Sequence, residues 1–355
     1  MTFDNCRFPD LLNRLTDATG ELDQKHIWPA AQLRWLDEAG VLGWTVPREY
    51  GGTEISSPEL VAGYEQLAAA CLTTTFVLTQ RNGAIQRIAG SANESVKATL
   101  LRGMVHADVF ATVGISHLTT SRQHLAKPVV SVRETDAGFV FDGFMPWVTG
   151  AKSADYIVSG GTLEDGRQIL AALATDHPGV HPQEPVKLMA LSASQTGAVE
   201  LRDVEVPRDM LIAGPIEQVM KQTSGGAGSF TTSALALGVA NAAVTKLGDR
   251  ASRRADLQAV YEQFAADVAR LSDDLHATAR GDASDEHTAE SLRRRANSLA
   301  LRSTQAVLTA TKGAGYVAGH PAERAVREAM FFLVWSCPQP VAAAALREFA
   351  CTFDG

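Results

Sequence analysis

The chain has 355 residues, of which 45% are hydrophobic and 20% are charged, and its formal net charge is -8. This length allows two or three packed subdomains, and the acidic balance argues against a dedicated nucleic-acid-binding protein, which would normally present a basic face. The four cysteines show no CxxC spacing, which predicts reduced thiols and no metal site. The sequence shows neither a signal-peptide pattern nor an apolar run of membrane-spanning length, so we expect a soluble cytoplasmic protein.

The first hundred or so residues carry helical periodicity. Apolar residues recur at helical spacing over residues 10–42. Ser57 followed by Pro58 predicts a further helix start, because a capping hydroxyl precedes a proline at the first helical position. Helical spacing continues to about residue 104, so we expect an N-terminal α-helical domain over residues 1–109.

At about Phe110 the spacing of the apolar residues changes from helical to the pattern of short strands. Turns at residues 136–138 and 164–166 separate these strands. This pattern predicts a middle β domain over residues 110–214. Beyond it, long Ala-, Leu- and Arg-rich helical patterns predict a C-terminal helical domain over residues 215–355. The order helical, β, helical indicates an α+β multidomain fold.

The stretch FVFDGFMPWVTG, residues 139–150, is the most informative part of the β region. Asp142-Gly143 between apolar residues predicts a hairpin turn. Trp147 and Thr149 are two residues apart, so their side chains share one face of a strand. This pair could bind a flat conjugated ligand whose edge needs hydrogen bonds. The alternative interpretation is that Trp147 is a core tryptophan buried on a sheet.

Five motifs in this order resemble the acyl-CoA dehydrogenase family of flavoproteins across nearly the whole chain. The resemblance implies an N-terminal helical domain, a middle β-barrel-like domain and a C-terminal four-helix bundle, assembled as a dimer or tetramer. It also implies FAD bound between the β domain and the bundle. The motifs are VPREYGG, FDGFMPWVTGAKSADYIV, LSASQTGAVELRDVEVPRDMLI, SALALGVANAA and GAGYVAGHPAERAVREA, which begin at residues 46, 141, 191, 233 and 313.

The resemblance also implies roles for individual residues near the flavin ring. Trp147 and Thr149 would pack against the isoalloxazine and hydrogen-bond to it. Ser116 stands where the family has a threonine that contacts the flavin, and the alternative for a serine in a turn is a bond to local backbone.

A second group of residues is implied at the phosphate end of FAD. Arg254 falls where a bundle arginine reaches the pyrophosphate of a partner subunit, and an arginine fork suits that contact. Gly313 and Gly315 fall on a glycine turn that lets backbone approach the cofactor. The alternative for Arg254 is a solvated side chain on a helix surface, and the alternative for the two glycines is a helix cap.

The sequence departs from the family at its catalytic base, which is normally a glutamate that removes the α-proton of an acyl thioester. That position falls on Ser336 here, and the early bundle position used by a minority of members falls near Gly228. We therefore treat the catalytic residue as unknown, with His117 and Cys337 as candidates. His124, Glu323 and Glu328 are further groups that could be recruited as the base, although the two glutamates fit ion-paired surface positions better.

Three functions follow from this resemblance. The first is FAD-dependent α,β-dehydrogenation of an acyl-CoA or related acyl thioester in lipid metabolism, with an atypical or missing base. The second is a base-less partner subunit of a hetero-oligomeric dehydrogenase. The third is a flavin-dependent monooxygenase on the same fold, which needs no α-proton base. The assembly is expected to be a homo- or hetero-oligomer, and the substrate stays open.

Overall fold

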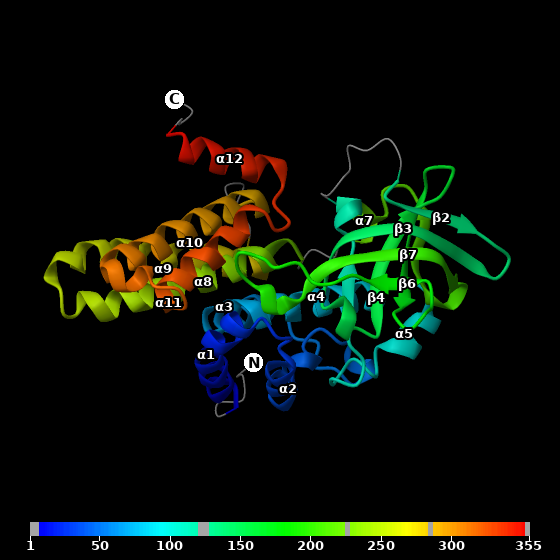
Figure 1. The fold of residues 1–355 in the computed structure, drawn as a ribbon, viewed down its shortest axis with the longest axis horizontal. Coiled ribbons are helices and arrows are strands. Elements are labelled where there is room, and N and C mark those ends of the chain that lie inside the picture. Colours follow the sequence, from blue (N-terminus) through cyan, green and yellow to red (C-terminus); the bar gives the residue numbers. More distant parts are fainter. Residues whose placement is uncertain (1–6, 120–127, 224–227, 283–286, 352–355) are drawn as a thin grey trace.

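The computed structural model describes residues 7–119, 128–223, 228–282 and 287–351. Helices come first, a β-sheet region follows, and helices return, so the predicted order of elements is confirmed. Figure 1 shows the C-terminal helices on one side of the molecule, the sheet on the other, and the N-terminal helices beneath their junction. In these described ranges, no helix combines the length and the apolar character that crossing a membrane requires.

The N-terminal helices surround α4, the one that matters most for the site. This helix packs against α3, against α8 of the C-terminal region and against strand β1, so it contacts all three parts of the chain. Pro29, at the N-cap of α2, lies within residues 10–42, where apolar residues recur at helical spacing, and separates α1 from α2. The helices are α1 (Arg7–Lys25), α2 (Ala30–Glu38), α3 (Ser57–Ala70), α4 (Leu72–Ala89) and α5 (Glu94–Leu100), with 3-10 turns η1 (Val41–Gly43) and η2 (Arg48–Tyr50).

The middle region is one eight-stranded mixed sheet with the order β6-β7-β3-β2-β4-β5-β8, and β1 pairs with β4 off this path. Strands β1 and β2 run parallel to β4, and the other pairs are antiparallel. The strands are β1 (Ala111–Gly114), β2 (Val130–Glu134), β3 (Gly138–Thr149), β4 (Tyr156–Thr162), β5 (Gln168–Ala174), β6 (Val180–Pro182), β7 (Thr196–Pro207) and β8 (Leu211–Ile216). Short elements around them are α6 (Ser116–Thr119), η3 (Ala151–Ser153), η4 (Ser192–Ser194), η5 (Arg208–Met210) and α7 (Val219–Thr223).

Strand β3 corrects the hairpin predicted at Asp142-Gly143. The strand runs through this dipeptide, and its register against β7 shifts once between Phe141 and Gly143 and again between Met145 and Val148. Gly143 has φ +137, and a Cβ there would clash with the carbonyl of Val129. The dipeptide therefore forms a β-bulge and not a turn. The second shift contains Pro146, whose missing N–H suits an irregular position in the ladder.

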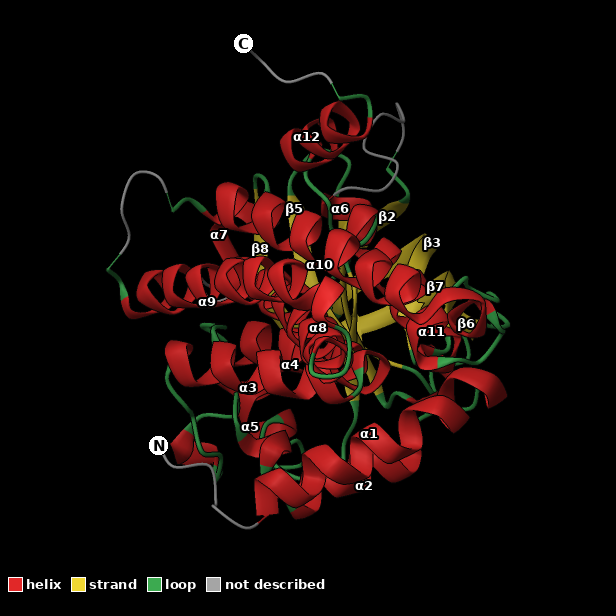
Figure 2. Ribbon diagram, turned by 90° about the vertical axis from the view of Figure 1, so that its left-hand side faces the viewer, coloured by secondary structure: helices red, strands yellow, loops and turns green. Residues whose placement is uncertain are grey.

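The C-terminal helices pack around α8. Figure 2 looks nearly along α8 and shows the helices α3, α4, α9, α10 and α11 around it, and all five contact it. The backbone of α3 lies so close that a Cβ at Gly238 would clash with the carbonyl of Glu65. The elements are α8 (Gly228–Ala251), η6 (Ala255–Leu257), α9 (Gln258–Arg280), α10 (Ala289–Thr311), η7 (Lys312–Tyr316), α11 (Pro321–Met330), η8 (Phe331–Leu333) and α12 (Gln339–Phe349).

Candidate functional site

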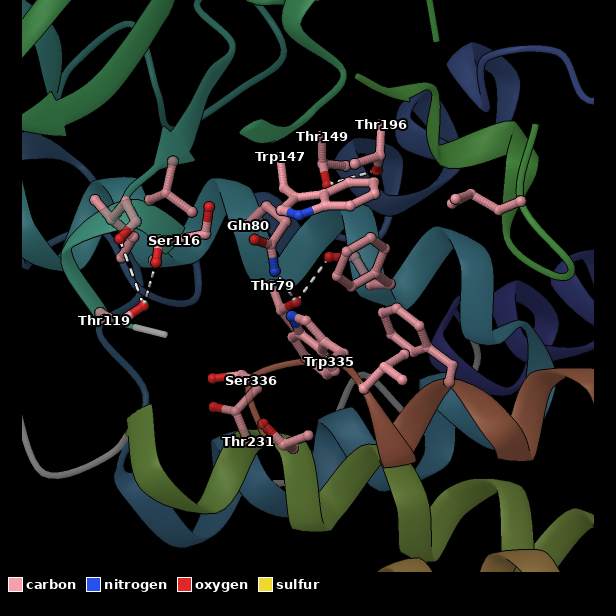
Figure 3. Close-up of a pocket in the computed structure, with 18 of the residues that line it drawn as sticks. Thr79, Gln80, Ser116, Thr119, Trp147, Thr149, Thr196, Thr231, Trp335 and Ser336 are labelled. Atoms are coloured by element: carbon pink, nitrogen blue, oxygen red, sulfur yellow. Dashed lines mark hydrogen bonds between the residues drawn. The ribbon is translucent and has the colours of Figure 1, made fainter. Parts of the chain in front are cut away.

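A cavity of about 620 Å³ lies where the three regions meet. Its walls come from α3 and α4, from strands β1, β3 and β7, from the loop at residues 188–190, and from α8 and the end of α11. Four of the residues predicted from the sequence line it, and they come from segments far apart in the chain (Figure 3). These are Ser116, Trp147, Thr149 and Ser336.

The wall formed by the sheet, here called the β wall, presents an indole and several hydroxyl groups. Trp147 lines the cavity with 49% of its surface exposed, whereas Thr149 is buried. The hydroxyl of Thr149 lies 2.9 Å from that of Thr196, which lies 2.9 Å from the hydroxyl of Ser194. The Ser116 hydroxyl is buried and has no hydrogen-bond partner among the described residues. This wall therefore offers a flat aromatic surface and an unused hydrogen-bonding group.

A second wall, the α4 wall, is one face of helix α4. The residues at positions 76, 79, 80, 83, 86 and 87 line the cavity, and these spacings of three and four place them on one side of the helix. The Gln80 amide donates to the Thr79 hydroxyl at 3.1 Å, and that hydroxyl donates to the Phe76 carbonyl at 2.7 Å. The sequence interpretation did not identify this wall.

Three aromatic side chains close one end of the cavity, and we call them the aromatic cluster. The rings of Phe331 and Trp335 stack at 5.1 Å with an interplanar angle of 11°. Phe76 from the α4 wall packs edge-on against both, at 4.9 Å and 5.0 Å. Offset stacking and edge-to-face contacts are the preferred geometries of aromatic pairs, so this end of the cavity is apolar and well ordered.

The charged groups of the lining are two arginines, Arg87 and Arg327, and no carboxylate belongs to the described lining. Arg327 is neutralised, because it pairs with Asp23 of α1 at 2.6 Å and with Glu323 of α11. It also donates to the carbonyl of Met189 at 2.9 Å. We call this group the Arg327 clasp, since one side chain joins the N-terminal helices, the loop between β6 and β7 and the C-terminal helices.

Residues 11–108 match the family model described as acyl-CoA dehydrogenase, N-terminal domain. The structure superposes on butyryl-CoA dehydrogenase from Megasphaera elsdenii with a TM-score of 0.78 at 19% identity, over 96% of this chain and 98% of that one. The chain has the fold of the acyl-CoA dehydrogenase family. FMN-bound TdsC from Paenibacillus sp. A11-2, described elsewhere as a dibenzothiophene monooxygenase, shares this fold with a TM-score of 0.83 at 17% identity, over 98% and 97% of the two chains.

Sequence relatives of this acyl-CoA dehydrogenase-fold chain include proteins described with both reactions. A probable acyl-CoA dehydrogenase, YngJ of Bacillus subtilis (strain 168), is 25% identical over 71% of this chain and 68% of its own length. The dibenzothiophene monooxygenase of Rhodococcus qingshengii is 26% identical over 52% of this chain, and the match spans less than half of that protein, 45%. The predicted fold class is thereby confirmed, and the relatives leave the reaction open.

Ser336, at the position expected for the family's glutamate, lies in the cavity wall near Thr231 (Figure 3). Its backbone has φ +45, a left-handed conformation that is uncommon for a residue other than glycine. Gly228, near the alternative base position, begins α8 and carries no side chain. The described lining residues supply hydroxyl, amide and guanidinium groups to the cavity, but neither a carboxylate nor an imidazole that could act as a general base.

The two catalytic candidates from the sequence lie outside this lining. His117 is buried, and its Nε2 lies 2.9 Å from the carbonyl of Gly160. Burial lowers the pKa of His117, so a neutral imidazole that donates to this carbonyl is favoured. Burial raises the pKa of the Cys337 thiol, which disfavours a reactive thiolate. His124 lies outside the described residues.

The three residues predicted for the phosphate end of FAD lie far from this cavity. Arg254 follows α8, whereas Thr231 near the start of that helix lines the cavity, and the helix from residue 231 to its end at residue 251 spans about 30 Å at helical rise. The Arg254 guanidinium pairs with Asp256 at 2.6 Å and donates to the Ala310 carbonyl at 3.1 Å.

Gly313 and Gly315 lie near Arg254, in the η7 turn that follows α10. A Cβ on Gly313 would meet no atom within 4 Å, whereas one on Gly315 would lie 2.8 Å from the Thr311 side chain. Gly313 thus borders open space and Gly315 is needed for close packing. The structure thus places none of the three residues that were predicted to contact FAD at this cavity.

Glu323 and Glu328 of α11 are not members of the described cavity lining. Glu323 is ion-paired, as expected, but Glu328 is buried and not on the surface. Burial raises the pKa of Glu328 to about 7, and Asp23 adds to this effect. Arg324, whose Nε lies 3.8 Å from Glu328, and also Lys246 and Arg327 oppose it. Glu328 therefore takes up a proton on folding at mildly acidic pH.

This proton makes folding stability depend on pH. Because the folded pKa of about 7 exceeds the ordinary value of 4.5, the contribution of Glu328 is fully present below pH 4.5 and is lost as the pH rises through 7. The variant Glu328→Gln should be more stable than the wild type at pH 8, by about 3 kcal/mol. Urea unfolding at several pH values measures this difference. Glu164→Gln, at an exposed position, is the control and should follow the wild-type curve. Equal pH slopes for wild type and Glu328→Gln would contradict the prediction.

Proposed function

We propose that this chain is a flavin-dependent oxidoreductase whose flavin ring lies on Trp147 against the β wall. The half-exposed indole and the partnerless buried hydroxyl of Ser116 support this proposal, because a flavin offers both a flat face and polar edge atoms. Thr149 supplies a second hydroxyl at the same wall. The residues present therefore fit the cofactor that the fold implies.

FAD is the proposed form of the cofactor, although the similar TdsC structure is described as FMN-bound. The longer dinucleotide needs a second set of contacts for its phosphates. Arg254 beside the η7 turn is a suitable group, but it lies at the far end of α8 from its own cavity. The proposal thus includes an oligomer in which a second copy, or a related chain, presents Arg254 and Gly313 to this flavin.

For the reaction, we propose oxygenation of a small substrate. Abstraction of an α-proton needs a positioned base, and a serine such as Ser336 has no basic partner among the described lining residues. A reduced flavin, when bound, would supply the two electrons that, together with two protons, let one atom of dioxygen enter the substrate and the other leave as water. The hydroxyls of Ser336, Thr231 and Ser116 would orient polar atoms at the site, and the aromatic cluster would exclude water.

Dehydrogenation of an acyl thioester is the second candidate. The match of residues 11–108 to the acyl-CoA dehydrogenase N-terminal domain and the likeness to YngJ favour it. It would require a base that the described cavity does not contain, from the substrate or from a partner chain.

The visible spectrum of the purified protein tests the cofactor, and anaerobic mixing with butyryl-CoA tests the reaction. We expect a yellow protein that releases FAD on denaturation and whose flavin absorbance is unchanged by butyryl-CoA. After chemical reduction, admitting oxygen should restore the oxidised spectrum within seconds. Protein that stays colourless with added FAD and FMN would refute flavin binding. Rapid bleaching by butyryl-CoA would instead establish the dehydrogenase.

A further inference from the structure

Arg87 is a cation in the cavity wall that has no acidic partner among the described residues. Its Nη1 donates to the Gly83 carbonyl at 2.7 Å, but its buried Nε has no hydrogen-bond partner in the part of the chain that the structure describes. Burial lowers the pKa of Arg87. Arg327 in the same lining pairs with two carboxylates, so its charge is compensated, whereas that of Arg87 is not compensated by any described residue.

A half-buried guanidinium such as that of Arg87 is stabilised by a counter-charge, and proteins usually pair such a group. A bound anion would supply the counter-charge that Arg87 lacks among the described residues. Gln86, also in the lining, adds a neutral amide beside it.

The α4 wall places this cation at a fixed distance from the aromatic cluster. Arg87 bonds to the Gly83 carbonyl, so part of its guanidinium lies level with residue 83 of the helix. Phe76 is seven residues earlier, which corresponds to about 10 Å along the helix axis. The cavity thus has an aromatic end and a cationic end, separated by roughly the length of a phenyl ring joined to a carboxylate by a short alkyl chain.

We propose that the substrate is an aryl-alkyl carboxylate, with its ring against the aromatic cluster and its carboxylate on Arg87. The arginine fork suits a carboxylate because it can donate two parallel hydrogen bonds. The inference rests on the proposed function only in taking this cavity as the substrate site. The flavin is assigned to the β wall, whereas Arg87 and Phe76 belong to the α4 wall.

Two probes of the same shape test this proposal in flavin-loaded protein: 4-phenylbutanoate and the neutral 4-phenylbutan-1-ol. Dissociation constants come from tryptophan fluorescence or calorimetry. A charge-assisted hydrogen bond predicts that the wild type binds the carboxylate about 10- to 100-fold more tightly than the alcohol. Arg87→Gln should lose this preference and bind the alcohol with unchanged affinity, and Arg87→Lys should keep part of it. Arg34→Gln, which removes an exposed arginine, should behave like the wild type.

Equal binding of the two probes by the wild type would overturn the proposal. So would an equal loss for both probes in Arg87→Gln, or a loss of flavin affinity in that variant, which would place Arg87 on the cofactor. Because the variant removes a half-buried charge that no described carboxylate pairs with, its Tm should match or exceed that of the wild type. A lowered Tm with the carboxylate preference intact would assign Arg87 a structural role. Colourless protein that still prefers the carboxylate would refute the flavin and leave this inference standing.

Discussion

Replacing Arg327 with methionine should lower the free energy of unfolding by about 3 to 5 kcal/mol, because it leaves two partly buried carboxylates without their counter-charge. The side chains of Asp23 and Glu323 are 12% and 21% exposed, so water compensates them poorly. The variant also loses the hydrogen bond to the Met189 carbonyl, which connects the loop between β6 and β7 to α11. Chemical denaturation of wild type and variant at pH 7 measures the loss.

The matched control for this experiment is Arg280→Met. Arg280 pairs with Asp282 at 3.4 Å, but these side chains are 54% and 69% exposed. Exposed pairs contribute about 0 to 1 kcal/mol, so this variant should unfold almost like the wild type. If both variants lost the same small amount, the clasp would be no more than a surface ion pair, and the prediction would be wrong.

Replacing Trp147 with alanine should weaken flavin binding by about 10- to 100-fold, because stacking of a flat heteroaromatic ring on an aromatic side chain is worth about 1 to 3 kcal/mol. The indole is already half exposed in the cavity, so its removal should cost little folding stability. Titration of the apo protein with FAD, followed by flavin fluorescence, gives the dissociation constants. Trp147→Phe should recover part of the affinity, since it restores an aromatic face.

The control for Trp147 is Val186→Ala, which trims another exposed apolar side chain that does not belong to the cavity lining. It should leave FAD affinity unchanged. If Trp147→Ala bound FAD as tightly as the wild type, the flavin would not lie on the β wall. The site assignments that depend on Trp147, those of Ser116 and Thr149, would then have to be withdrawn.

The alternation of periods along the chain was enough to predict the order of helices, sheet and helices. The turns at residues 136–138 and 164–166 were also predicted correctly, because each joins two adjacent antiparallel strands. Asp142-Gly143 has the same turn composition but lies inside a strand. Only its partner strand β7 shows that the glycine serves a bulge, and local sequence holds no information about that pairing.

The β wall of the site could be found from the sequence because Trp147 and Thr149 are neighbours on one strand. The α4 wall could not, since α4 is buried on most of its circumference and its apolar period is therefore blurred. The aromatic cluster joins Phe76 to Trp335, two residues far apart in the chain, and only the packing of η8 and the residues after it against α4 brings them together. The sequence does not single out Arg87 as a binding residue. What distinguishes this arginine is that no carboxylate among the described residues pairs with it, and that depends on the tertiary structure.

The position of the cavity has a practical consequence for finding its ligand. Its lining is drawn from the N-terminal helices, the sheet region and the C-terminal helices at once, so no separated part of the chain can retain it. A compound that fills it binds the assembled molecule and not the unfolded chain, and occupancy at 100 times the dissociation constant adds about 2.7 kcal/mol to stability. Candidate ligands can therefore be found by measuring the melting temperature of the protein in the presence of each compound of a collection. This measurement does not require a turnover assay.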